Sequence, residues 1–235
     1  ARLRIRQYAE QGGVLALELA TEWVAAKLNG QASLLREGAE ARSDQRGVLL
    51  RAAEIVEDTC AKAAEADTVE RLRGLEGGAA AAYFGALPAL FPPSLEFEGR
   101  ERRPPRDPVN ALLSLTYTMV HWEWVRECEV IGLDPLIGFY HEVDYGRESL
   151  ACDLLEPFRP IADRWVWELF RTRQFERRDF ASDHDRPGCS LKKGARGRYY
   201  QAYEQWMAQH RTHLRETVEA LARRLLHDGS DVVSQ

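Results

Sequence analysis

Three side chains in the second half of the chain have the types and spacing of a divalent-metal site. Asp153 and Glu156 lie three residues apart near the start of a predicted helix, so both carboxylates project from one side of it. His141 precedes Asp153 by twelve residues, at the end of a short segment predicted to be extended. Carboxylate oxygens with one imidazole suit Mn²⁺, and suit Mg²⁺ less fully because Mg²⁺ prefers oxygen. On spacing alone, a solvated acidic pair and a structural histidine remain the commoner explanation.

A fourth carboxylate, Glu76, lies in a segment whose helical neighbours are apolar. Leu72, Ala79 and Tyr83 recur at three- and four-residue spacing, and Glu76 falls on the same stripe. An unpaired buried charge is unfavourable, so Glu76 needs a partner. The spacing leaves two partners open, a metal ion or an arginine such as those around Arg103.

Basic residues are concentrated in three short segments elsewhere in the chain. The net charge of −5 does not exclude a nucleic-acid ligand, because net charge describes solubility and nonspecific attraction rather than the surface that touches a ligand. On composition alone, however, solvated helix faces are the favoured explanation of such clusters. The candidate DNA-binding residues among them are Arg102, Arg103, Arg171, Arg173, Arg177, Arg178, Lys192 and Lys193.

Length and composition indicate an ordinary globular protein. The chain has 235 residues, of which 45% are hydrophobic and 29% charged, enough for a core without disulfide or zinc support. Its four cysteines are far apart and form no C-x-x-C pair, which fits a reducing cytoplasm. Neither a signal peptide nor an apolar run long enough to span a membrane is present. We therefore expect one cytoplasmic domain over residues 1–235, with residues 228–235 forming a flexible tail.

The elements that must position these side chains are predicted to be helices, which makes the expected fold class an all-α helical bundle. A break is expected at Gly12-Gly13, an N-cap at Asp67 or Thr68, a helix start at Asp107-Pro108 and a helix stop at Gly132. Loops are expected at about residues 37–47 and 179–195. The predicted helices cover about residues 5–35, 48–66, 68–87, 107–131, 149–169 and 196–226.

Several ordered sequence blocks resemble the helical domain of the CRISPR-associated adaptation integrase family. The resemblance extends over about residues 1–215, and several blocks at suitable intervals are more specific than any single motif. The blocks are AAKLNG followed by QASLLR, EGGAAAAYF, RRPPRDPVN leading into DPVNALLSLTY, GLDPLIGFYH, and GRESLACDLLEPFRPIADR.

The resemblance implies an enzyme and a ligand set. It makes Glu76, His141 and Asp153 the ligands of Mg²⁺ or Mn²⁺, with Glu156 as a supporting catalytic residue. It implies a metal-dependent DNA integrase and endonuclease that joins DNA 3′-hydroxyl ends into a CRISPR array by transesterification during spacer acquisition.

The resemblance also implies partners and a missing segment. Double-stranded DNA with 3′-hydroxyl ends and CRISPR repeat DNA would be substrates. A homodimer would assemble with a small ferredoxin-like partner protein, and some family members are fused to or associated with a reverse transcriptase. The family carries an N-terminal β-rich domain that this sequence lacks; because residue 1 is not Met, we expect the chain to continue upstream.

Three other readings remain open at this point. A transposon-borne integrase relative or a metal-dependent nuclease would use the same residues, since water can replace the 3′-hydroxyl. A DNA-binding scaffold subunit would need only the basic residues. In a purely structural helical domain, the carboxylates would form salt bridges and bind no metal.

Overall fold

The computed structural model describes residues 1–101, 103–182 and 188–227, and within them the fold is an all-α bundle, as the sequence predicts. The described secondary structure also includes short 3-10 turns at Leu87–Leu90, Pro93–Leu95 and Arg177–Asp179 and a single two-stranded sheet. The α-helices are α1 (Arg2–Ala9), α2 (Val14–Ala41), α3 (Arg46–Ala63), α4 (Val69–Ala86), α5 (Pro108–Ile131), α6 (Ser149–Arg171), α7 (Lys193–Ala208) and α8 (Arg211–His227).

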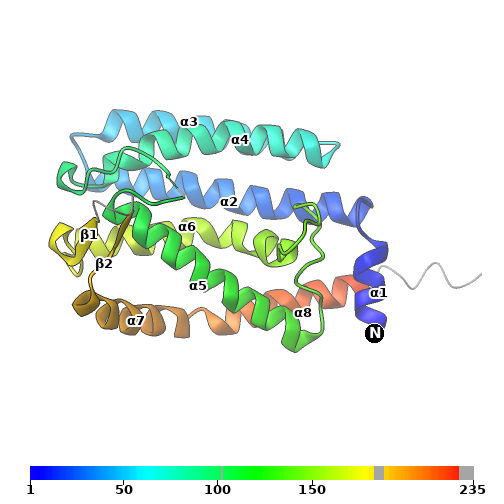
Figure 1. Ribbon diagram of the computed structural model, residues 1–235. Coiled ribbons are helices and arrows are strands. Elements are labelled where there is room, and N and C mark those ends of the chain that lie inside the picture. The colour runs from blue at the N-terminus through cyan, green and yellow to red at the C-terminus, as the bar shows by residue number, and fades with distance from the viewer. Residues whose placement is uncertain (102, 183–187, 228–235) are drawn as a thin grey trace, which may run out of the picture.

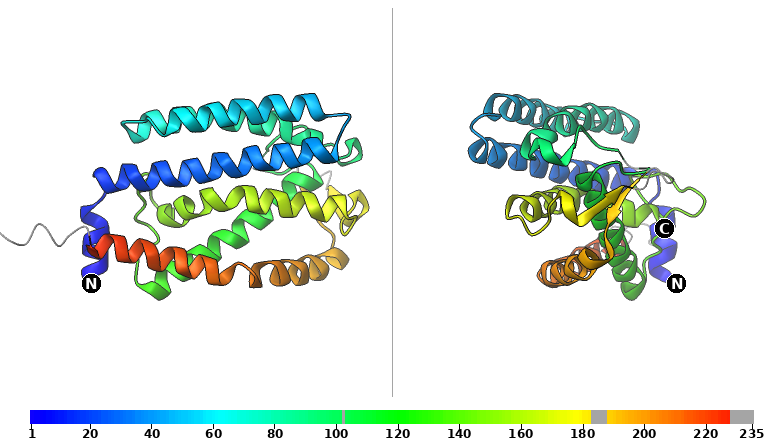
Figure 2. Two further views of the ribbon diagram at one scale, coloured as in Figure 1. Left: turned by 180° about the vertical axis from the view of Figure 1, so that it is seen from behind. Right: turned by 60° about the vertical axis from the view of Figure 1, so that its left-hand side comes forward.

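The helices are stacked in layers, with α3 and α4 side by side on one face (Figure 1). Helix α2 lies beneath them, α6 packs on α2, and α5 crosses α6 obliquely. From behind, α8 can be followed along α5 to the short helix α1 (Figure 2). This arrangement makes α6 the central helix, in contact with α2 on one side and α5 on the other.

The helix starts and stops follow local chemistry that the sequence already shows. The hydroxyl of Thr68 accepts a hydrogen bond from the Arg71 amide at 3.2 Å and caps α4. Asp107 caps α5 in the same way, through the Asn110 amide at 2.8 Å. At the other end of α5, Gly132 has a φ of 96°, the left-handed conformation that ends many helices. These three predictions are confirmed.

Helix α2 is longer than the sequence pattern indicates. A loop was expected from residue 37, but the helix continues to Ala41. The added turn is held by tertiary burial, because Gly38 and Ala39 are packed inside the bundle. The expected break at Gly12-Gly13 is confirmed, since it separates α1 from α2.

The C-terminal region differs most from expectation. The predicted loop at 179–195 contains two antiparallel strands, β1 (Phe180–Ser182) and β2 (Cys189–Leu191), and the amide of Cys189 donates to the Pro105 carbonyl at 2.7 Å. The single predicted final helix is two helices, α7 and α8, separated at residues 209–210. The predicted tail at 228–235 lies outside the described residues.

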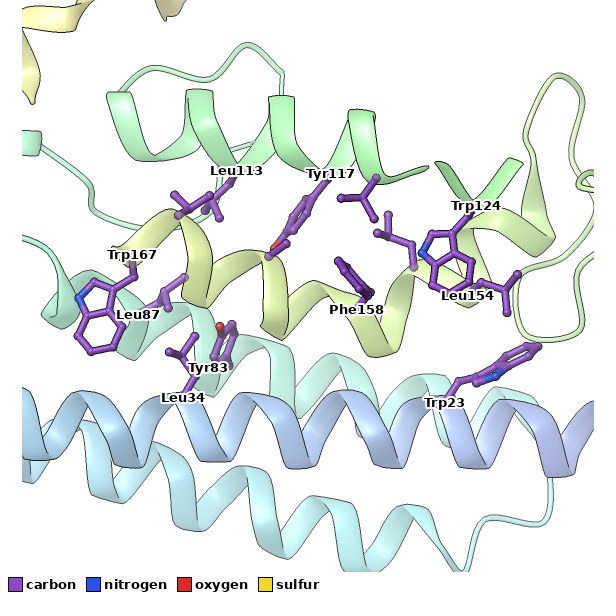
Figure 3. Packing of buried hydrophobic residues seen from close by; sticks show 14 of the residues in the cluster. Trp23, Leu34, Tyr83, Leu87, Leu113, Tyr117, Trp124, Leu154, Phe158 and Trp167 are labelled. Atoms are coloured by element: carbon purple, nitrogen blue, oxygen red, sulfur yellow. The ribbon is translucent and has the colours of Figure 1, made fainter. Parts of the chain in front are cut away.

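Large aromatic side chains fill the space around α6 (Figure 3). Phe158 and Trp167 of α6 are buried, as are Tyr83 of α4 and Trp124 of α5. Trp122 is 57% exposed, so it takes no part in this core. The layers around α6 are therefore closely packed.

Candidate metal centre and DNA-binding surface

A pocket opens where α2, α4, α5 and α6 meet the loop that connects α5 to α6. Its wall is rich in charged side chains. The lining residues are Lys27, Arg73, Glu76, Ala80, Phe84, Tyr117, Tyr140, His141, Glu156 and Arg159.

A close approach of α2 and α6 brings opposite charges together in this pocket. A Cβ atom on Gly30 would lie 2.9 Å from Pro160 Cβ, so only glycine allows the two helices to come this near. Both helices run from the α1 end of the bundle (Figures 1 and 2). One turn earlier on each helix, Lys27 therefore faces Glu156.

The ammonium of Lys27 joins the two acidic residues of the pocket. Its Nζ donates to Glu76 Oε1 and to Glu156 Oε2, the latter at 2.5 Å. The exposed fractions of the Lys27 and Glu156 side chains are 7% and 6%, and that of Glu76 is 19%. Carboxylates from α4 and α6 thus converge on one cation, although their positions are 80 residues apart in the sequence.

Arg159 holds the other oxygen of Glu156. Its Nε donates to Glu156 Oε1 at 2.8 Å, and its guanidinium lies 4.7 Å from the centre of the Tyr117 ring. Burial alone would raise the pKa of Glu156, but the charges of Arg159 and Lys27 outweigh burial and hold that pKa well below its usual range. Glu156 is therefore a carboxylate in the folded protein at neutral pH.

Asp153 lies behind the pocket and organises the loop that carries His141. Its carboxylate is fully buried and accepts backbone hydrogen bonds from Phe139 and Tyr140 at 2.7 and 3.0 Å, and from His141 at 2.8 Å. It also lies 2.7 Å from His141 Nδ1. With Nδ1 engaged in this way, the second ring nitrogen, Nε2, is the one left to act in the pocket.

The segment that Asp153 organises is irregular, where a short extended piece was expected. A Cβ atom on Gly138 would lie 2.8 Å from Asp153 Oδ2, so the loop can wrap this carboxylate only with glycine there. Glycine is therefore required for steric reasons at position 138, before Phe139, Tyr140 and His141.

A further buried carboxylate, Asp163, supports the floor of the site. It accepts hydrogen bonds from the hydroxyls of Tyr83 at 2.7 Å and of Tyr117. Figure 3 shows these tyrosines reaching α6 from α4 and α5 respectively. Burial raises the pKa of Asp163 and, together with its charge, the pKa values of both tyrosines. The network fixes Tyr117, and with it the face on which Arg159 rests.

The structure brings the four predicted site residues together in two layers. Glu76, His141 and Glu156 line the pocket, whereas Asp153 does not. Sequence reasoning missed Lys27 and Arg159. Lys27 had a recognisable signal, a lone charge within the apolar run WVAAKLNG.

No group of three or more His, Cys, Asp or Glu side chains stands close enough to hold a metal ion within the part of the chain that the structure describes. The arrangement of the carboxylates nevertheless suits a cation, because Glu76 and Glu156 already converge on the Lys27 ammonium. His141 lines the same pocket, and a donor set of two carboxylates and one imidazole suits Mn²⁺ or Mg²⁺.

The predicted basic residues lie on the surface. Arg103, Lys192 and Lys193 are exposed, and Arg102 lies outside the described residues. Arg173 is exposed with a φ of 57°. The other three arginines form ion pairs with acidic neighbours, namely Arg171 with Glu168, Arg177 with Glu96 and Arg178 with Glu176.

These basic segments meet at one end of the bundle, opposite α1 (Figure 1). The Cys189 amide donates to the Pro105 carbonyl at 2.7 Å, which joins the hairpin to the segment after Arg103. Arg177 reaches Glu96 at 3.1 Å, which joins the end of α6 to the same connection. Segments separated by up to about 90 positions thus come together at this end of the bundle, whose exposed basic residues we call the basic surface. Along α6, the 15 residues from Glu156 to Arg171 correspond to about 22 Å.

A family model described as CRISPR associated protein Cas1 matches residues 1–205. A relative from Thermodesulfovibrio yellowstonii, named CRISPR-associated endonuclease Cas1 1, is 44% identical over 233 residues, which cover 99% of this chain and 73% of the relative. A CRISPR-associated exonuclease Cas4/endonuclease Cas1 fusion from Geobacter sulfurreducens is 38% identical over 209 residues, or 84% of this chain and 36% of the fusion.

Solved structures show the same fold. A CAS1 protein from Thermotoga maritima matches with a TM-score of 0.82 at 25% identity, covering 100% of this chain and 73% of that chain. A chain of a Cas6-RT-Cas1–Cas2 complex matches with a TM-score of 0.83 at 25% identity, covering 92% of this chain and 24% of that chain. Among the described residues, no helix has the length and apolar character needed to cross a membrane.

Proposed function

This chain belongs to the CRISPR-associated Cas1 family, and we propose that it is a divalent-metal-dependent DNA integrase and endonuclease of CRISPR adaptation. The observation that carries the proposal is the pocket that Glu76, His141 and Glu156 line together. These residues come from α4, the α5–α6 loop and α6, so the site exists only in the assembled bundle. The endonuclease names of the relatives support the same class of activity.

We assign Glu76, His141 and Glu156 as the residues that would hold Mg²⁺ or Mn²⁺. This assignment revises the sequence-based set, in which Asp153 was a ligand and Glu156 a supporting residue. Asp153 is engaged by three backbone amides and His141, whereas Glu156 faces the pocket. Asp153 becomes a positioning residue. When bound, the ion would neutralise a non-bridging phosphate oxygen and favour the alkoxide form of the attacking hydroxyl.

The reaction we propose is a transesterification without a covalent enzyme intermediate. The 3′-hydroxyl oxygen of the incoming DNA forms a bond to the target phosphorus, the bond to the leaving 3′-oxygen breaks, and the hydroxyl proton is transferred to the leaving oxygen through solvent. Arg159 and Arg73 place fixed positive charge at the pocket wall, where negative charge develops on the phosphate. Asp153 orients His141 through Nδ1.

The basic surface would bind the DNA backbone away from the site. Exposed arginines and lysines contact phosphates without reading sequence. At about 3.4 Å per nucleotide, the 22 Å between Glu156 and Arg171 corresponds to roughly six nucleotides. The substrates would be double-stranded DNA with 3′-hydroxyl ends and CRISPR repeat DNA.

We also propose an assembly. A homodimer with the small ferredoxin-like partner protein is in keeping with the neighbour that is a Cas6-RT-Cas1–Cas2 complex, and the same neighbour supports association with a reverse transcriptase. An enzyme that works on array DNA would act in the cytoplasm. Light scattering of the chain, alone and mixed with the partner protein, tests the assembly.

A strand-transfer assay tests the activity. A duplex with a labelled 3′-hydroxyl end is incubated with repeat DNA and Mn²⁺, and joined products are separated from cleaved ones on a denaturing gel. We expect joined product with wild type and none with Glu76→Gln. Cleavage without joining would identify a nuclease, and DNA binding with neither product would identify a scaffold subunit.

A further inference from the structure

The ammonium of Lys27 occupies the position at which the two pocket carboxylates converge. Its Nζ donates to one oxygen of Glu76 and to Oε2 of Glu156. Only 7% of the Lys27 side chain is exposed, so these oxygens replace most of the water that an ammonium would otherwise bind. Lys27 therefore behaves as a cation bound within the site.

A divalent ion and this ammonium cannot share that position. Mg²⁺ binds carboxylate oxygens at about 2.0–2.1 Å, and the same oxygens are already at hydrogen-bonding distance from Nζ. An ion bridging Glu76 and Glu156 would overlap Nζ, and two cations so close would repel each other strongly. One of them has to leave.

Arg159 is not displaced in the same way. It bonds to Oε1 of Glu156, the oxygen that Lys27 does not use, and its guanidinium rests on Tyr117. The two oxygens of Glu156 thus face different cations. The position open to exchange is the one that Lys27 holds.

We infer that Lys27 is an internal counter-ion, and that metal loading of this site is an exchange of the Lys27 ammonium for the divalent ion. The inference rests on the proposed metal-dependent function. Without metal, Lys27 keeps Glu76 and Glu156 paired and the bundle intact. With metal, the anchored stem of Lys27 keeps the freed ammonium inside the pocket. Lys27 therefore lowers the affinity of the site for divalent ions.

Removal of this charge tests the exchange. Lys27→Met keeps much of the stem and removes the ammonium, and Lys62→Met is the matched control because Lys62 is exposed on α3. Titration calorimetry with MnCl₂ measures affinity, and thermal unfolding with and without Mn²⁺ measures stability. We expect Lys27→Met to bind Mn²⁺ at least about tenfold more tightly than wild type, and the control to match wild type.

Thermal unfolding gives a second expectation. Lys27→Met should melt at a lower temperature than wild type without metal, because Glu76 and Glu156 lose the ammonium that they share. Added Mn²⁺ should raise its melting temperature by more than it raises that of wild type. Equal or weaker Mn²⁺ binding by Lys27→Met would overturn the exchange and make Lys27 a support of the loaded site. If wild type bound no Mn²⁺ and joined no DNA, the proposed function would fall as well.

A measurement on wild type keeps the inference testable if Lys27→Met does not fold. The chain has four lysines, at positions 27, 62, 192 and 193, so mass spectrometry can follow the acetylation of each one. We expect Mg²⁺ to speed the acetylation of Lys27 several-fold and to leave Lys62 unchanged. An unchanged or slower rate at Lys27 in saturating Mg²⁺ would overturn the exchange.

Discussion

At the scale of single residues, His141 and Asp153 form a pair with divided roles. Asp153 binds the loop amides and Nδ1 of the imidazole, so His141 is held with Nε2 available. The sequence already indicated both residues. The sequence could not say whether Asp153 or Glu156 faces the pocket. Their D-x-x-E spacing places both carboxylates on one side of the helix and does not show which of them the loop will cover.

Replacement of His141 by Ala should separate chemistry from binding. We expect strand transfer to fall at least about a hundredfold, because the ion is left with one ligand fewer. DNA affinity should change little, since the DNA contacts that we propose are on the basic surface. Activity, DNA affinity and thermal unfolding are measured on one preparation. A variant that melts early yet remains fully active per folded molecule would make His141 a structural residue.

Replacement of Asp153 by Asn tests the positioning role. The amide presents an NH₂ group where backbone N–H groups now donate, so we expect a loss of about 3 kcal/mol in the free energy of unfolding, even without metal. Glu156→Gln, by contrast, should abolish Mn²⁺ binding in calorimetry. If Asp153→Asn were fully stable and unable to bind Mn²⁺, Asp153 would be a ligand.

The low pKa of Glu156 predicts how stability responds to acid. Its folded pKa lies below the unfolded value near 4.5, so its contribution is fully present above that value and is lost as the pH falls toward the folded pKa. We expect the stability of wild type to decline below about pH 4.5. The stability of Glu156→Gln, which lacks this carboxylate, should decline less steeply with falling pH, as measured by urea unfolding at the same pH values. Parallel declines would contradict the assignment.

At the scale of the elements, features set by local chemistry could be predicted and features set by packing could not. The caps at Thr68 and Asp107 and the stop at Gly132 depend on neighbouring residues, and all three were predictable. The extra turn of α2 depends on the burial of Ala39. The break before α8 contains no glycine or proline, so the sequence does not indicate it. The two strands of the hairpin are too short to show the alternation of buried and exposed residues that is typical of a strand.

The glycine contact between α2 and α6 offers a test at this scale. Gly30→Ala would place a methyl group 2.9 Å from Pro160 Cβ, so we expect a loss of about 1–3 kcal/mol in unfolding free energy and weaker pairing of Lys27 with Glu156. Gly74→Ala in α4 is the control, because nothing lies within 4 Å and alanine should add up to about 1 kcal/mol. If Gly30→Ala and wild type had similar free energies of unfolding in urea, α2 and α6 would be able to move apart without a loss of stability.

At the scale of the whole molecule, the basic segments become one surface only when the chain folds. We expect replacement of Arg171, Arg173, Arg177 and Arg178 by Gln to weaken DNA binding. The salt dependence of binding should also become less steep, by roughly one unit of slope for each phosphate that is no longer neutralised. Because three of these arginines already pair with carboxylates, the total decrease in slope should be smaller than four units. Arg71→Gln and Arg223→Gln, on α4 and α8, serve as controls. An unchanged slope would make the cluster a solvated face.

The pocket brings together residues that the ribosome adds to the chain at well-separated times. Lys27 and Glu156 are separated by 129 positions, and Glu76 lies between them. A growing chain that has not yet released α6 holds Lys27, Glu76 and His141 without Glu156. An incomplete or prematurely ended chain therefore lacks the complete pocket. Under the proposed function, such unfinished copies of the chain would neither cut nor join DNA.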